Sequence, residues 1–251
     1  MMKKIMVIVK KDLRETLRTK AFYVSMGIVI FVLVALAAGL GRNIGALIQQ
    51  ETSLAEIASA IQPLVGTTAF TLSLMLMLLF CMYTNAYTLT MEKVKRSIES
   101  LLCTPLSLRQ ICLGKSLAVF LPSVILGLVF TFSGIVGINQ FFIVPKLGHF
   151  IMPGAAPLVA ILVAVPLIVF SFASLMITLQ LIITNIHWIN AALIGLVIAV
   201  MFGLSPPVLK FGSASWSIVF ISLGVAAVLA LVTIYLSRLV TKERIVLSSK
   251  G

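Results

Sequence analysis

Seven charged side chains gather in the segment 92–115, which reads EKVKRSIESLLCTPLSLRQICLGK. Two of them are the glutamates Glu92 and Glu99, and the other five are basic. Opposite charges three or four residues apart on a helix lie within reach of each other, and they are also free to pair with a partner surface. Charge-free stretches of 35 and 30 residues flank the segment. The chemistry that this set predicts is therefore electrostatic recognition of a partner.

The end of the same segment partly matches a nucleotide-binding loop. Residues 109–116 read RQICLGKS, whereas loops that hold nucleotide phosphates follow the pattern G-x-x-x-x-G-K-[ST]. Arg109 stands where the first glycine belongs, and that glycine lets the backbone curl around a phosphate. No strand is predicted before it. We therefore do not expect this chain to bind ATP.

The composition indicates an integral membrane protein. Of the 251 residues, 61% are hydrophobic and 10% are charged, and the mean hydropathy is +1.18. A soluble domain carries about 25% charged residues because a globule needs a polar surface. We interpret the net charge of +12 as a topology signal with attraction to anionic membrane lipid, and not as a sign of nucleic-acid binding.

Charge-free stretches predict six transmembrane helices, since one crossing takes about 20 apolar residues. A stretch of 63 residues is too long for one span and divides at the polar sequence TNIHW, residues 184–188. We place the spans at about 21–41, 64–89, 116–138, 156–183, 189–204 and 215–237. The predicted fold class is all-α, with residues 1–251 forming a single transmembrane domain. We expect an outer loop at 42–63 with a short surface helix at 53–61, and a re-entrant or interfacial segment at 203–215.

The positions of the basic residues predict the orientation. Sixteen of the 19 lysines and arginines precede the first span, lie in 92–115 or follow the last span. Basic residues are retained on the cytoplasmic side of a membrane. We therefore expect a multi-pass protein of the plasma membrane with both termini and the 92–115 loop in the cytoplasm.

Residues 1–20 predict an amphipathic helix on the membrane surface. Apolar side chains such as Ile5, Val9 and Leu13 share one half of a helical wheel, and a basic set that includes Lys10 and Arg14 occupies the other half. Asp12 lies on the apolar side and breaks the pattern. The alternative is a positive flank that serves only to orient the first span.

Groups for acid–base or metal chemistry are sparse. No Asp, Glu, Lys or Arg falls within a predicted span, and the two histidines, His149 and His187, are expected near opposite membrane faces. Proton-coupled transporters and intramembrane hydrolases generally need ionisable groups inside the membrane. We therefore expect a chain that is not an enzyme and has no metal or cofactor of its own.

Uncharged polar residues do occur in the predicted spans. Such residues either line a translocation path or serve close helix packing and interhelical hydrogen bonds. Ser171, Ser174 and Thr178 share one helix face, so that face should meet another helix. The candidates for a path are Thr71, Asn85, Thr131, Ser171, Ser174 and Thr178.

The 92–115 loop has the pattern of two helices with a break between them. Apolar residues from Val94 to Leu102 have helical spacing, Thr104-Pro105 interrupts them, and Ser107 can cap a second helix. This loop resembles the signature loop of the ABC transporter type-2 export permeases. The residues that carry the resemblance are Glu92, Lys95, Arg96, Glu99, Leu101, Leu102, Thr104, Pro105, Leu106, Ser107, Gly114 and Lys115. Lys93 and Arg96-Ser97 depart mildly from the pattern of many members.

The resemblance implies six spans and an N-terminal interfacial helix. It also implies a separate cytoplasmic ATPase subunit that binds ATP and Mg and docks on this loop and on the N-terminal helix. It implies a working unit of two permeases, as a homodimer or a heterodimer with a sibling, and two ATPases. It also implies that Glu92 and Glu99 anchor the loop electrostatically, and that Leu101, Leu102 and Leu106 fill a groove on the ATPase. Gly114 and Lys115 complete the expected coupling interface. The alternative is a secondary transporter or channel-like protein that works without an ATPase.

Overall fold

A computed structural model describes the chain over residues 2–20, 54–85, 108–182 and 216–238, with shorter pieces inside 22–39 and 191–204. Every regular element in these residues is helical. The elements are α1 Met2–Arg18, α3 Leu54–Asn85, α6 Leu108–Ile138, η2 Asn139–Ile143, α7 Val144–Leu147, α8 Ala155–Val159, η3 Ala160–Ala164, α9 Val165–Ile182 and α11 Trp216–Ser237. The predicted all-α class is confirmed for the described part of the chain.

Four helical stretches are long and apolar enough to cross a membrane. They are Ile61–Asn85, Gln110–Ile143, Ala155–Ile182 and Trp216–Ser237, and they match the predicted spans 64–89, 116–138, 156–183 and 215–237. The predicted spans 21–41 and 189–204 lie partly outside the described residues, and their described pieces are helical. Val29, in the first of these, is buried in a cluster with Leu76 and Phe80 of α3.

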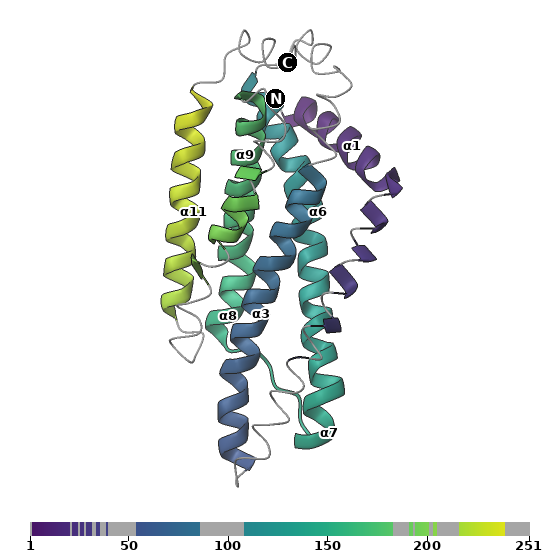
Figure 1. Cartoon of the computed structure of the whole chain (residues 1–251), viewed down its shortest axis with the longest axis vertical. Coiled ribbons are helices and arrows are strands. Elements are labelled where there is room, and N and C mark those ends of the chain that lie inside the picture. The colour runs from purple at the N-terminus through teal and green to yellow at the C-terminus, as the bar shows by residue number, and fades with distance from the viewer. Residues whose placement is uncertain are drawn as a thin grey trace.

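The long helices pack side by side as a bundle (Figure 1). α3 and α6 are antiparallel neighbours, the chain returns through α8 and α9, and α9 contacts α3, α6 and α11. α3 is the most buried of the four apolar stretches and α11 the least. α1 lies at one end of the bundle against α6, at the end where α3, α9 and α11 finish (Figure 1).

α3 is one continuous helix where the sequence predicts a separate surface helix and a span. Residues 54–85 form one helix with Pro63 inside it, whereas we expected the loop 42–63 and a separate surface helix at 53–61. A proline removes one helical hydrogen bond and can kink a helix, but it does not end the helix when the residues on both sides of it remain helical. The segment from Leu54 onward therefore continues without a break into the apolar stretch Ile61–Asn85.

Two π-helical turns shape the return from α6 to α9. The first, Asn139–Ile143, ends α6, and the second, Ala160–Ala164, lies directly before α9 and its Pro166. π turns absorb an extra residue and re-aim the helix that follows. Buried Asn139 links the two arms: its Nδ2 donates to the Ile135 carbonyl at 2.9 Å, and its Oδ1 accepts from the Ile151 N–H at 2.9 Å. The connection between α6 and α8 thus contains an ordered corner.

Candidate functional site at the junction of α1 and α6

Only the end of the predicted coupling interface falls within the described residues. Gly114 and Lys115 lie in the first turns of α6, and both are buried. The other predicted interface residues lie outside the described part of the chain: Glu92, Lys95, Arg96, Glu99, Leu101, Leu102, Thr104, Pro105 and Leu106. Gly114 and Lys115 lie where the predicted loop enters the bundle.

A buried ion pair joins α1 to the start of α6. The Lys115 Nζ lies 3.5 Å from the Asp12 Oδ2, and the side chains are 2% and 3% exposed. Asp12 belongs to the predicted surface helix, and Lys115 is the last residue of the charged loop. The pair therefore connects two segments that the resemblance assigns to one functional unit.

Asp12 lies on the face of α1 that packs against the bundle. Val9 and Thr16, one turn before and one turn after it, are also buried. The Thr16 Oγ1 donates to the Asp12 carbonyl at 2.9 Å, so this hydroxyl is satisfied within α1. The apolar side of the helix is thus used for protein packing in its middle turns. The acidic residue that breaks the amphipathic pattern is the one that meets a lysine.

The charges of this pair are costly to separate. Moving one charged group out of water costs several kcal/mol, and only a nearby opposite charge offsets the cost. Removing one partner of a buried pair typically lowers stability by about 3–5 kcal/mol, whereas replacing both with apolar groups is often neutral. Loss of either charge alone is therefore costly, whereas the pair as a whole adds little stability over an apolar contact.

The pair also alters the expected span. The apolar stretch Gln110–Ile143 includes Lys115 near its beginning, whereas the predicted span 116–138 began just after it. A lysine lies inside this stretch because Asp12 reaches it from α1. The expectation that spans lack basic and acidic residues holds for the predicted boundaries and not for the observed helix.

A second polar contact joins α3 and α6. The Thr84 Oγ1 and the Ser123 Oγ are 3.2 Å apart and buried, and either atom can be the donor. Each hydroxyl also bonds to its own helix, Thr84 to the Phe80 carbonyl at 2.8 Å and Ser123 to the Val119 carbonyl at 2.7 Å. Neither residue was singled out from the sequence, where hydroxyls in an apolar run carry no sign of their partners.

The predicted path residues are spread over three helices. Thr71 is half-buried, Ser174 is intermediate, and Asn85, Thr131, Ser171 and Thr178 are buried. Three of the hydroxyls donate to a carbonyl one turn earlier: Thr71 to Thr67 at 2.9 Å, Thr131 to Gly127 at 2.7 Å and Thr178 to Ser174 at 2.8 Å. Their role in a path stays a prediction.

The polar face of α9 contacts α11 at Ser171. The Thr233 Oγ1 of α11 lies 3.5 Å from the Ser171 carbonyl, and it also donates to the Leu229 carbonyl of its own helix at 2.8 Å. Hydroxyl groups that satisfy their own helix allow close helix approach without leaving a polar atom unsatisfied. This face therefore takes part in packing between α9 and α11.

Within the described part of the chain, no three His, Cys, Asp or Glu side chains come together as a candidate metal site. The candidate functional site of the described residues is thus the buried ion pair between Asp12 of α1 and Lys115 of α6. Comparisons of the chain with protein-family models, curated proteins and solved structures give no match.

Proposed function

We propose that this chain is the permease subunit of an ATP-binding-cassette exporter, driven by a separate cytoplasmic ATPase subunit. The observation that carries the proposal is the 92–115 segment, with its two-helix pattern and its resemblance to the loop of the type-2 export permeases. The described structure adds support at the end of this segment. Its last residues, from Leu108 to Lys115, form the first turns of α6, and Lys115 pairs with Asp12 of α1.

The junction suggests how a partner's movement would reach the spans. A loop displaced by nucleotide-driven closure of the ATPase would pull on the start of α6, because loop and helix are one chain. α1 would follow, because Asp12 and Lys115 would each be left as an unpaired buried charge if they lost each other inside the bundle. α6 packs against α3 and α9. A displacement of α6 would therefore switch the bundle from one packing arrangement to another.

The expected assembly follows the same resemblance. Two permeases, identical or siblings, would pair in the plasma membrane with two ATPases that bind ATP and Mg, and both permease termini would be cytoplasmic. α11 offers an exposed apolar surface for lipid or a second permease, with Phe220, Leu231 and Tyr235 all more than 60% exposed. Scarce charge in the spans favours a hydrophobic or amphipathic substrate.

Co-purification tests the proposal. The full-length chain would be extracted from host membranes in mild detergent and captured, and its partners would be identified by mass spectrometry. We expect a soluble subunit with a complete nucleotide phosphate loop. Glu99→Ala and Leu102→Asp should each reduce recovery of this subunit at least about tenfold. Truncating a residue that dominates an interface weakens the free energy of binding by more than about 1.4 kcal/mol, which is tenfold in affinity.

Glu51→Ala is the matched control, since it removes one carboxylate from the predicted outer loop. It should leave recovery of the ATPase unchanged. If no ATPase is recovered and the purified chain alone transports a substrate in liposomes, the exporter proposal is wrong and a secondary transporter takes its place.

A further inference from the structure

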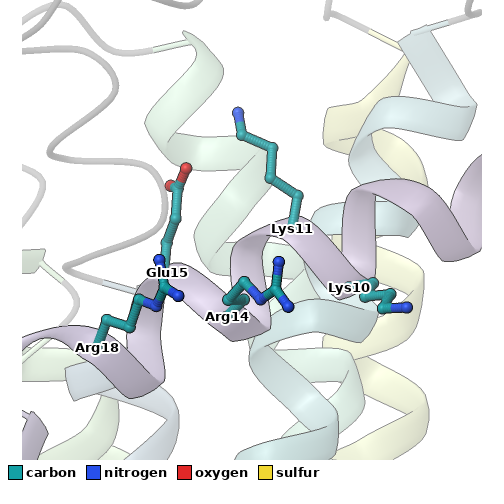
Figure 2. A pocket seen from close by; sticks show the side chains of 5 residues that line it. All are labelled: Lys10, Lys11, Arg14, Glu15 and Arg18. Atoms are coloured by element: carbon teal, nitrogen blue, oxygen red, sulfur yellow. The ribbon is translucent and has the colours of Figure 1, made fainter.

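The exposed side of α1 carries a basic hollow. Five side chains line an open cavity of about 400 Å³, and all of them belong to exposed positions. They are Lys10, Lys11, Arg14, Glu15 and Arg18. Four are cationic and one is anionic. In Figure 2, Lys10, Arg14 and Arg18 follow one another along the helix, whereas Lys11 and Glu15 extend away from it.

These charges are not satisfied by one another. None of the five side chains forms an ion pair or a hydrogen bond with another residue of the described structure. Lys10, Arg14 and Arg18 are spaced four residues apart, and like charges at this spacing disfavour a helix. Glu15 offsets one of the four positive charges. An anion bound in the hollow would therefore relieve repulsion within α1.

The depth of α1 along the bundle is consistent with lipid headgroups. α1 is held at Lys115, and the helical stretch from Lys115 to Ile143 is about 42 Å long at about 1.5 Å per residue. A bilayer with its headgroup regions is about 40–45 Å thick. If the apolar stretch fills the bilayer, α1 lies among the phosphates of one leaflet.

An exposed apolar side chain borders the basic stripe. Met6 is 60% exposed and lies one helical turn before Lys10. α1 thus has a face buried against α6, an apolar flank and a basic face. An apolar flank beside cationic residues is the arrangement of helices that lie in a membrane surface, where the flank enters the acyl boundary and the cations meet phosphates.

We propose that the hollow binds the phosphate group of an anionic phospholipid from the leaflet at this end of the bundle. Lys10 and Arg14 are the principal contacts, because they lie nearest the apolar flank, and Arg18 extends the stripe. The lipid thereby holds α1 to the membrane on one side while Asp12 holds it to α6 on the other. This inference does not depend on the proposed transport function.

Native mass spectrometry of the purified full-length chain tests this site. The protein in detergent would be titrated with phosphatidylglycerol and, separately, with phosphatidylcholine. We expect the wild type to bind phosphatidylglycerol more tightly. Each basic residue near an anionic lipid surface contributes about fivefold in affinity, so Lys10→Gln/Arg14→Gln should raise the Kd for phosphatidylglycerol about 25-fold and leave phosphatidylcholine unaffected.

Two controls keep the result specific. Arg238→Gln/Lys242→Gln removes the same charge after the last span and should change the Kd less than about twofold if the hollow is the site. Lys10→Arg/Arg14→Lys keeps the charge and should retain binding, which separates loss of charge from loss of folding.

Three outcomes would overturn the proposal. The first is equal loss of phosphatidylglycerol in the charge-matched tail variant, which would indicate general electrostatic attraction. The second is complete competition by inorganic phosphate, which would assign the hollow to a soluble anion. The third is unchanged lipid binding with loss of a co-purifying protein from Lys10→Gln/Arg14→Gln, which would assign this surface to a protein partner.

Discussion

At the scale of single residues, Asp12 and Lys115 are the side chains whose removal should matter most. Asp12→Asn leaves a buried ammonium without its carboxylate, so the free energy of unfolding should fall by about 3–5 kcal/mol. The double variant Asp12→Leu/Lys115→Met removes both charges and should lose much less. Thermal unfolding of the purified protein in detergent measures both effects.

Glu15→Gln is the matched control for that experiment. It also removes one carboxylate from α1, but at an exposed position, and should change the free energy of unfolding by less than about 0.5 kcal/mol. Equal shifts for Asp12→Asn and Glu15→Gln would show that the pair does not hold α1 to α6. A double variant as unstable as Asp12→Asn alone would show that a group other than the two charges is responsible.

At the scale of elements, the packing of α3 against α6 depends on a glycine. A Cβ placed on Gly127 would overlap the Met77 side chain, and it would lie 3.3 Å from the Met77 Cα, whereas a Cβ on Gly137 of the same helix meets nothing within 4 Å. Overpacking a tight contact costs about 1–3 kcal/mol, and alanine otherwise favours a helix over glycine by about 1 kcal/mol. Gly127→Ala should therefore be less stable than Gly137→Ala by about 1–3 kcal/mol, as measured by denaturation in detergent.

A compensating substitution distinguishes a steric clash from a loss of backbone flexibility. Met77→Ala removes the atom nearest to the added Cβ, so it should lessen the cost of Gly127→Ala. Equal effects of Gly127→Ala and Gly137→Ala would mean that the two helices lie farther apart than the structure has them.

At the scale of the whole molecule, the two ends of the bundle should lie on opposite sides of the membrane. His149 follows α7 at one end, and Arg238 follows α11 at the other, where α1 also lies (Figure 1). In a chain freed of Cys81, Cys103 and Cys112, a membrane-impermeant maleimide should label His149→Cys in intact cells. It should label Arg238→Cys only after permeabilisation, because the basic end is expected in the cytoplasm.

Lys10→Cys provides the internal control, since α1 lies at the same end as Arg238. It should be protected in intact cells to the same degree. Labelling of Arg238→Cys and protection of His149→Cys would reverse the orientation and remove the coupling loop from contact with a cytoplasmic ATPase.

The sequence by itself determined the all-α class and the positions of four helices that are long and apolar enough to cross a membrane. Hydropathy summed over about 20 residues is a local property, so long apolar runs identify membrane helices without knowledge of their neighbours. The concentration of basic residues before the first predicted span, in 92–115 and after the last span is likewise readable from their order along the chain. The same local reading expected a break between a surface helix at 53–61 and a span from 64, whereas Leu54–Asn85 is one helix with Pro63 inside it. Hydropathy does not show whether a helix continues across a proline between a less apolar and a more apolar segment.

The tertiary structure alone decided which residues meet. The helical wheel marked Asp12 as an exception on an apolar face, yet only the packing of α1 on α6 brings it to Lys115. The same holds for Thr84 with Ser123 and for Gly127 with Met77. These contacts join residues far apart in the chain, and their existence depends on the rotation and depth of each helix in the bundle. Periodicity reports which face of a helix is apolar, whereas the partner of that face is set by how all the helices pack together.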